Sequence, residues 1–288
     1  MQNMRPYFSI IIPALNEEVA LPLLLEDLAN QTFKNFEIIL VDGHSEDKTV
    51  EKAKGFAKKL PRLTITNSKQ RNVSTQRNLG AKVAKGKYLF FNDADNRLPS
   101  YFLEGVKYNL SRKPTDVFTN WCISDTDKPA DKAVASLINV GIEASNLIEY
   151  QAALGALIGC RRSIFSKIGG FNPSIPFAED GEFVRRAAKK GFRFTIYKTP
   201  RFTFSLRRFR KSGKIRSLQQ YAKLHLKILS QKNIDKKEYP MGGHTFTGDQ
   251  TTNSLLEKIQ TALSLTSKQA KLKEKIKSLI TLFENNNL

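Results

Sequence analysis

Two aspartates separated by one residue are the first candidates for chemistry in this sequence. Asp93 and Asp95 directly follow Tyr88–Phe91, an apolar run typical of a buried strand. Carboxylates at this spacing can hold a hard divalent cation, which prefers oxygen ligands. Such a cation would bridge the phosphates of a substrate and neutralise a departing diphosphate. Because an Asp-rich loop after a strand can also be only a solvated turn, the motif needs support from other strand ends.

Acidic residues stand at two further positions of interest. Asp42 follows the apolar run Phe36–Val41 and would suit the base or ribose of a nucleotide. Its alternative role is to cap the next helix, but Ser45 can cap that helix alone, which favours binding by Asp42. Glu179 and Asp180 open an expected helix. They can complement the helix dipole, or Asp180 can act as a general base on an acceptor hydroxyl.

Alternating strand and helix patterns would bring these acids together. We expect strands at the four apolar runs Phe8–Ile12, Phe36–Val41, Leu63–Thr66 and Tyr88–Phe91. We expect helices after the cap residue Asn16, over Ser45–Lys59, and over Asn72–Lys85 with Gly86 at the C′ position. This alternation predicts a parallel sheet, whose ligands lie beyond the carboxyl ends of the strands. The segments that should converge there are Pro13–Glu17, Asp42–Ser45 and Asp93–Asp95.

The second half of the sequence is less regular and then becomes strongly basic. Residues 155–171 indicate a strand, a short helix and a glycine turn, and Ala178–Lys190 indicates a helix. Arg207 to Glu238 holds 11 Lys and Arg residues against two acids. Within it, one helical face is apolar. Such a helix can lie on an anionic membrane surface or against a lipid-linked phosphate acceptor, or it can pack on the rest of the protein.

The composition narrows the class of protein. The 288 residues are 40% hydrophobic and 26% charged, as in an ordinary globular protein. The net charge of +20 favours an anionic partner, whether nucleic acid, a membrane or a phosphorylated substrate. Two cysteines do not make a disulfide scaffold, and no His/Cys cluster has zinc-like spacing. Without a secretory signal or an apolar run of about 20 residues, we expect a cytoplasmic protein, soluble or peripheral on the cytoplasmic face of the membrane.

In their order along the chain, these segments resemble the family 2 glycosyltransferases, which have the fold called GT-A. The resemblance covers about residues 8–215, and it is carried by Ile12–Glu18, Val41–Thr49, Gln76–Gly80, Phe91–Asp95, Arg162–Phe171, Ala178–Asp180 and Ser205–Phe209. It implies an α/β fold with a Rossmann-like, mostly parallel sheet and flanking helices. It further implies a nucleotide-sugar-binding subdomain (1–120), an acceptor-side catalytic subdomain (121–215) and a basic helical C-terminal extension (216–288).

The resemblance also implies a reaction. A sugar would pass from a nucleotide-diphosphate sugar to an acceptor hydroxyl or phosphate with inversion, as in a hexosyltransferase. Mg²⁺ or Mn²⁺ would bind at Asp95, and Asp180 would be the base. Arg207 and Arg208 could contact the diphosphate, or only belong to the basic surface. The donor nucleotide would be lined by Pro13, Ala14, Glu17, Asp42 and Arg77, with Asp93 reaching the nucleotide or its ribose.

The sequence departs from the family pattern in one place. Many relatives supply a His metal ligand shortly after the last core strand, where this chain has Arg201–Ser205 without His. His225 and His244 are the substitutes that the sequence offers.

Three other functions compete with this interpretation. A nucleotidyltransferase would share the crevice and the metal, but the Glu179-Asp180 pair and the Arg207–Phe209 segment argue against it. A nucleic-acid-binding protein without transferase activity would suit the charge. Its basic residues would then be interleaved with aromatic ones on strands, which is not the pattern here. A family member that has lost its activity would not be expected to keep the acidic residues.

Overall fold

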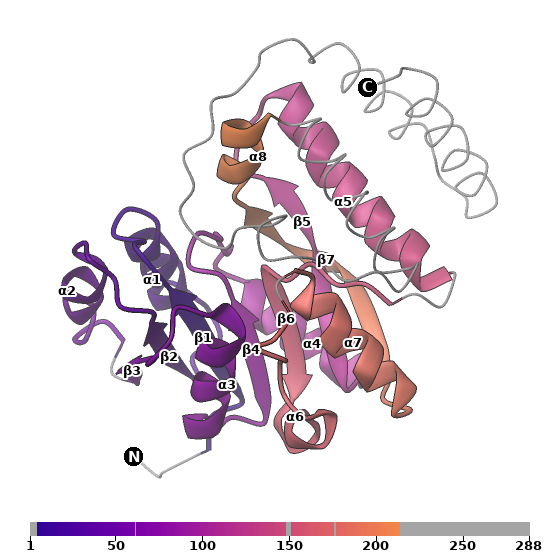
Figure 1. The fold of residues 1–288 in the computed structure, drawn as a ribbon, viewed down its shortest axis with the longest axis horizontal. Coiled ribbons are helices and arrows are strands. Elements are labelled where there is room, and N and C mark those ends of the chain that lie inside the picture. Colours follow the sequence, from indigo (N-terminus) through magenta and orange to yellow (C-terminus); the bar gives the residue numbers. More distant parts are fainter. Residues whose placement is uncertain (1–4, 61, 148–150, 176, 214–288) are drawn as a thin grey trace.

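The computed structural model describes residues 5–60, 62–147, 151–175 and 177–213, which are drawn in colour in Figure 1. The strands are β1 (Phe8–Ala14), β2 (Phe36–Asp42), β3 (Leu63–Asn67), β4 (Tyr88–Asn92), β5 (Val117–Ser124), β6 (Leu157–Arg161) and β7 (Phe194–Phe204). The helices are α1 (Leu21–Ala29), α2 (Thr49–Lys54), α3 (Val73–Val83), α4 (Phe102–Arg112), α5 (Pro129–Leu147), α6 (Arg162–Ile168), α7 (Glu179–Lys189) and α8 (Arg207–Ser212).

The described strands form one seven-stranded sheet in the order β3-β2-β1-β4-β6-β5-β7. The first four strands along the chain are parallel to one another, and β5 is parallel to β7. Only β6 reverses direction, running antiparallel to both β4 and β5. The expected mostly parallel α/β sheet with flanking helices is therefore confirmed. The expected boundary between residues 120 and 121 falls inside β5, so a single sheet crosses it.

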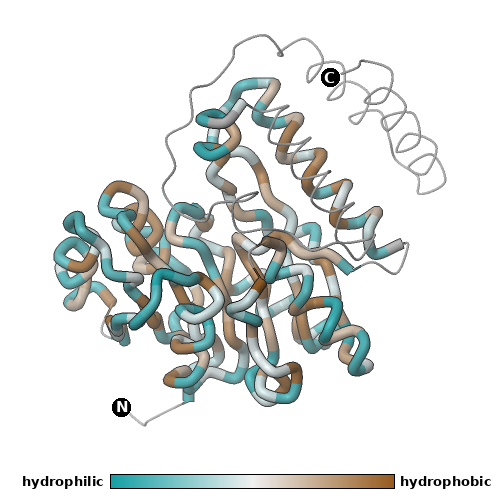
Figure 2. Tube along the Cα trace, viewed as in Figure 1, coloured by the Kyte–Doolittle hydropathy of each residue, from teal (hydrophilic) through white to brown (hydrophobic). Residues whose placement is uncertain are grey.

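Both faces of this sheet are buried, which explains the continuous apolar runs in its strands. In β1, Ile10 and Ile12 belong to one core and Ile11 to the other. The first core includes side chains of α1 and α4, and the second includes side chains of α6 and α7. Figure 2 shows hydrophobic residues alternating with polar ones along α5, which packs on β5. Among the described helices, none has both the length and the hydrophobicity to cross a bilayer.

Two expected helix starts are wrong, and for the same physical reason. Asn16 has φ 55 and its side-chain oxygen accepts from the amide of Glu46, so α1 begins only at Leu21. The hydroxyl of Ser45 accepts from the amide of Asn16 and donates to Asp42, so it caps no helix and α2 begins at Thr49. Both polar side chains are used to join two loops.

Gly86 is not the left-handed C′ residue that the sequence suggested. Helix α3 ends at Val83, followed by Ala84 in an extended conformation. A Cβ on Gly86 would lie 2.6 Å from the amide nitrogen of Ser9, so glycine is needed there for close approach to β1. The cap at the other end of α3 is as expected, because the side chain of Asn72 accepts from the amide of Thr75.

The second half contains elements that the sequence pattern did not reveal, namely α4, β5, α5 and β7. Arg201 to Phe204 belongs to β7, so only Ser205 follows the last strand. The expected strand, short helix and turn over residues 155–171 correspond to β6, α6 and the left-handed Gly169 and Gly170. The extension 216–288, including His225 and His244, lies outside the described residues, as does most of the basic segment after Arg207.

The packing of β6 against β5 depends on Gly159, which pairs with Phe118. A Cβ there would lie 2.0 Å from the Phe118 ring, which is fully buried and has no room to move. We expect Gly159→Ala to lower the free energy of unfolding by about 1–3 kcal/mol, the cost of overpacking a core. Gly141→Ala is the matched control, because that helical position in α5 is open and alanine should stabilise it by about 0.5–1 kcal/mol. Urea unfolding measures both; equal stability of the two variants would contradict this packing.

Candidate active site

Hydrogen bonds join the carboxyl ends of β1 and β2 and build one side of a candidate site. The amide of Gly43 donates to the carbonyl of Ala14 at 2.8 Å, and the amide of Asn16 donates to the hydroxyl of Ser45 at 2.9 Å. Asp42 is 4% exposed and accepts from the amide and the hydroxyl of Ser45, at 3.0 and 2.5 Å. The predicted convergence of these two strand ends is confirmed.

Gln76 of α3 ties the same strand ends together, a role that sequence reasoning missed. Its amide nitrogen donates to the carbonyls of Ala14 and Val41, each at 2.9 Å, in a buried setting. Pro13, the preceding residue of β1, is buried as well. A buried amide on the helix face that packs on the sheet is the signal that would have identified Gln76, since such a group requires hydrogen-bond partners.

The two aspartates after β4 have different partners. The carboxylate of Asp93 lies 3.1 Å from Nη2 of Arg77. Asp95 lies 3.1 Å from Nε of Arg207 and accepts a hydrogen bond from the hydroxyl of Ser205. Burial raises the pKa of Asp95, while the positive charge of Arg207 works in the opposite direction. The Asp-x-Asp motif therefore takes part in two separate ionic contacts.

Arg207, the first residue of α8, links the ends of β1 and β4. Its guanidinium contacts the carboxylates of both Glu17 and Asp95. Oε2 of Glu17 is buried and has no hydrogen-bond partner among the described residues. Arg208 follows in the same helix and is exposed. Glu17 and Asp95, which follow two different strands, thus share the guanidinium of Arg207, a residue 190 positions after Glu17.

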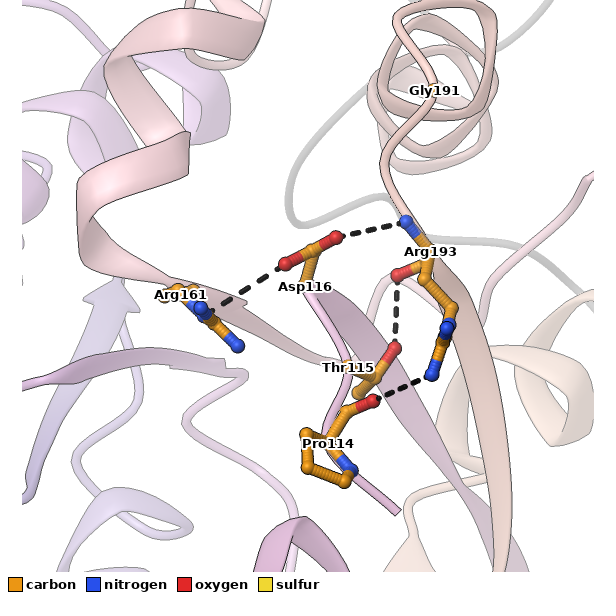
Figure 3. Close-up of a pocket in the computed structure, with 6 residues that line it drawn as sticks. All are labelled: Pro114, Thr115, Asp116, Arg161, Gly191 and Arg193. Atoms are coloured by element: carbon orange, nitrogen blue, oxygen red, sulfur yellow. Dashed lines mark hydrogen bonds and ion pairs between the residues drawn. The ribbon is translucent and has the colours of Figure 1, made fainter.

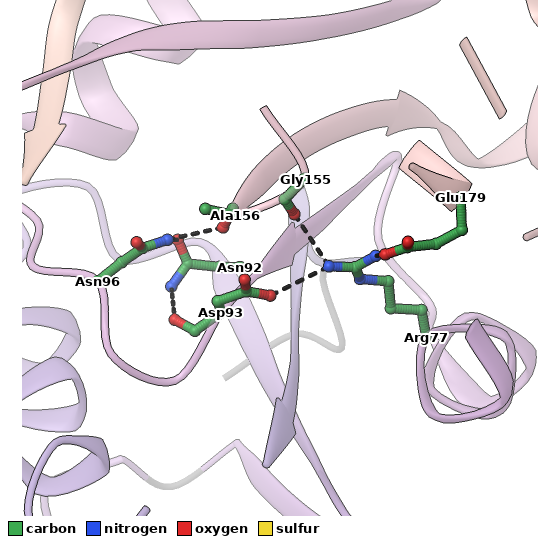
Figure 4. A network of polar contacts seen from close by, with 7 residues as sticks. All are labelled: Arg77, Asn92, Asp93, Asn96, Gly155, Ala156 and Glu179. Carbon is green, nitrogen blue, oxygen red and sulfur yellow. Dashed lines mark hydrogen bonds and ion pairs between the residues drawn. The ribbon is translucent and has the colours of Figure 1, made fainter. Parts of the chain in front are cut away.

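A second ionic cluster forms around Arg77 of α3 (Figure 4). Arg77 is only 2% exposed, and it donates to Oε1 of Glu179 at 2.8 Å, to Oδ1 of Asp93 at 3.1 Å and to the carbonyl of Gly155 at 2.9 Å. Burial disfavours its charge, but the carboxylates of Asp93 and Glu179 keep the pKa of Arg77 above its usual value. The cluster joins α3, the loop after β4 and the start of α7.

Two buried asparagines brace the loop that carries the aspartates. The amide of Asn96 donates to the side chain of Asn92 at 3.1 Å and to the carbonyl of Ala156 at 2.6 Å (Figure 4). The backbone amide of Asp93 donates to the same carbonyl at 2.9 Å. The loop is therefore fastened to the segment just before β6 by groups that have no contact with water.

Asp180 is the second residue of α7 and lies beside the Arg77 cluster. A Cβ on Gly155 would be 2.6 Å from its Oδ2, so the absence of a side chain there lets the carboxylate approach the backbone. Burial raises the pKa of Asp180 to about 7, the charge of Glu179 adds to this, and Arg77 opposes it. A carboxylate with a pKa near neutrality is suited to general base catalysis.

A polar cavity of about 300 Å³ lies away from these clusters (Figure 3). It is lined by Pro114, Thr115, Asp116, Arg161, Gly191 and Arg193. Arg161 pairs with Tyr88, the first residue of β4, so the cavity lies at the opposite end of the sheet from Asp93. Asp116 accepts a hydrogen bond from the amide of Arg193 at 3.0 Å and lies 3.7 Å from Nε of Arg161. The cavity is not part of the candidate active site.

Comparison with known proteins identifies relatives of this chain. Residues 9–169, more than half of the chain, match the family described as Glycosyl transferase family 2. An uncharacterized glycosyltransferase of Haemophilus influenzae is 29% identical over 204 residues. That alignment covers 66% of this chain and 64% of the relative, so the chain spans less than two thirds of the relative's length.

Solved structures with the same fold contain nucleotide sugars. The mannosyltransferase PcManGT from Pyrobaculum calidifontis, in complex with GDP-Man and Mn²⁺, has a TM-score of 0.62 at 17% identity, over 97% of this chain and 81% of that one. TarS 1-349 of S. aureus, in complex with UDP-GlcNAc, has a TM-score of 0.57 at 19% identity, over 81% and 69%. At these identities the likeness shows the fold alone, and it confirms the expected GT-A type.

The raised pKa of Asp180 has a measurable effect on stability. The folded state holds the proton up to about pH 7, whereas an unfolded aspartate loses it near 3.8, so stability falls as pH rises between these values. Asp180→Asn carries no such proton. We expect its stability relative to the wild type to increase across this window by at least about 1 kcal/mol, the equivalent of one pKa unit. Urea unfolding at pH 5 and pH 8 measures the difference; a value independent of pH would contradict the burial of this carboxylate.

Proposed function

The chain belongs to glycosyl transferase family 2, and from this premise we propose that it transfers a sugar from a nucleotide-diphosphate sugar to an acceptor hydroxyl or phosphate, with inversion at the sugar carbon. The observation that supports this most is the meeting of Glu17, Asp95 and Arg207 at the strand ends. Asp180 is linked to that meeting point through Arg77, which binds both Glu179, next to Asp180, and Asp93, two residues before Asp95. This arrangement supports a site in which Asp180 would be the base.

The donor would lie over the ends of β1, β2 and β4. Structures of the same fold hold GDP-Man and UDP-GlcNAc, which supports a nucleotide sugar as the donor here. Pro13 and Ala14 would form the floor beneath the nucleotide, with Asp42 and Asp93 near its base and ribose. Glu17 would lie beside the diphosphate, together with Arg207 and Arg208, whose positive charges suit phosphate oxygens.

The residues present fit a divalent metal, Mg²⁺ or Mn²⁺, of the kind that shares its ligands with a substrate. No group of three His, Cys, Asp or Glu side chains in the described part of the chain could bind a metal alone. Mg²⁺ usually needs only one or two carboxylates when substrate phosphates complete its coordination. Asp95 would supply one, and the unpartnered Oε2 of Glu17 adds a second acidic oxygen nearby. When bound, the metal would neutralise charge on the departing diphosphate.

The protein's own residues would perform the remaining steps. Asp180 takes the proton of an acceptor hydroxyl as the new bond to the sugar carbon forms and the bond to the donor phosphate breaks. The leaving diphosphate carries away the electrons of that bond, and Arg207 and Arg208 offset its charge. Attack from the face opposite to the leaving group needs only this one base, which is why inversion is proposed.

The net charge supports a proposal for the acceptor and for the cellular location. The net charge of +20 would attract a phosphate-bearing acceptor, including one linked to a lipid, or the cytoplasmic face of an anionic membrane. A nucleotidyltransferase would not need a base next to the metal loop, and a nucleic-acid-binding protein would need no carboxylates in its crevice. Transferase activity at a peripheral location is therefore the function that we propose.

Asp180→Asn tests the assigned base, because the amide keeps the size of the side chain but cannot take a proton. We expect release of nucleoside diphosphate in the presence of acceptor to fall by at least about 10²-fold, as for the loss of a general base. Affinity for the donor should stay unchanged in calorimetry. Glu182→Gln, on the same helix and paired with Arg186, is the control that should keep full activity. Wild-type turnover by Asp180→Asn would assign the base elsewhere.

A further inference from the structure

We propose that Arg77 is a positioning residue, which holds the aspartate loop Asp93–Asp95 and the base-bearing helix α7 at a fixed separation and does not contact the donor. This replaces its expected role in lining the nucleotide. The inference rests on the proposed function, since it concerns how Asp95 and Asp180 of that same site are held.

The burial of Arg77 leaves little of it for a ligand. Its side chain is 3% exposed, and both terminal nitrogens are engaged in contacts of 3.1 Å or less. Its guanidinium also lies 5.2 Å from the centre of the Phe171 ring, which covers one face. The third nitrogen, Nε, has no hydrogen-bond partner among the described residues but is buried. A nucleotide could reach the two terminal nitrogens only by displacing a carboxylate or a backbone carbonyl. Breaking a buried ion pair is strongly destabilising, so such an exchange is disfavoured.

The partners of Arg77 are the immediate neighbours of the functional carboxylates. Glu179 precedes Asp180 in α7, and Asp93 stands two residues before Asp95. Gly155, whose carbonyl accepts from Arg77, is the residue against which the carboxylate of Asp180 packs. One guanidinium therefore fastens three separate segments around the site, and the planar fork of arginine is what allows it to reach all three.

Arg77 also balances the charge of this cluster. The acidic groups around it are Asp93, Glu179 and Asp180, and each interacts with its positive charge. Among the charged groups that act on Asp180, Glu179 raises the pKa of its carboxyl and Arg77 lowers it. Loss of the arginine charge would leave three carboxylates unopposed, so Asp180 would hold its proton to a higher pH.

Two substitutions separate the geometry of Arg77 from its charge. Arg77→Lys keeps the charge but loses the fork, so we expect kcat to fall at least about tenfold while the dissociation constants of UDP and GDP with Mn²⁺ stay within about threefold. Arg77→Gln loses both, and the pH at which kcat reaches half its plateau should also move upward. Circular dichroism establishes that each variant is folded; if Arg77→Gln does not fold, the kcat and binding data of Arg77→Lys decide alone.

Arg186→Lys is the matched control. Arg186 also binds a carboxylate and two carbonyls, those of Glu182, Ile168 and Gly170, but on a part of α7 away from Asp180. Its variant should keep the wild-type kcat. An Arg77→Lys variant with unchanged kcat, or one in which only nucleotide affinity falls, would overturn the positioning role. A wild-type protein without transfer activity would instead count against the proposed function, so the two failures are distinguishable.

Discussion

A buried positive charge held between carboxylates is the interaction around which this site is organised. Moving an ion out of water costs several kcal/mol, and that cost is recovered only where the geometry is good and other hydrogen bonds are made. The two terminal nitrogens of Arg77 meet these conditions with Asp93, Glu179 and the carbonyl of Gly155, while its buried Nε has no hydrogen-bond partner among the described residues. Because these partners come from distant parts of the chain, the cluster can form only when the sheet, α3 and α7 are all in place.

The sheet itself supplies the remaining constraint. Parallel strands end along one edge, so the acids after β1, β2 and β4 are brought close together without any local signal in their own segments. The negative charges of these acids would repel one another, and two arginines offset that repulsion. Arg77 is buried within the fold, while the side chain of Arg207 in α8 is 46% exposed. The buried cation suits a structural role, and the exposed one suits contact with a substrate.

The sequence predicted the first four strands because their apolar runs are buried on both faces. It failed at the starts of α1 and α2, since Asn16 and Ser45 bond to each other's loops, and such contacts between distant segments leave no periodic signal. It also missed β7, whose Lys198, Pro200 and Arg201 mask the strand pattern at the edge of the sheet. The acids of the site could be predicted because they follow apolar strand runs. The burial of Arg77 could not be predicted, because an arginine in a helix is ordinarily exposed.

We propose that the strand ends bind a nucleotide diphosphate together with a divalent metal at Asp95, and calorimetric titration of UDP and GDP with and without Mn²⁺ tests this proposal. Asp95→Ala is compared with Asp125→Asn, since Asp125 pairs with Arg210 of α8 much as Asp95 pairs with Arg207. We expect Mn²⁺-dependent binding of at least one nucleotide by the wild type and by Asp125→Asn. Binding by Asp95→Ala should be at least about tenfold weaker, the loss expected for removing a metal ligand. Nucleotide affinity that is the same with and without Mn²⁺, or an Asp95→Ala variant with wild-type affinity, would contradict this proposal.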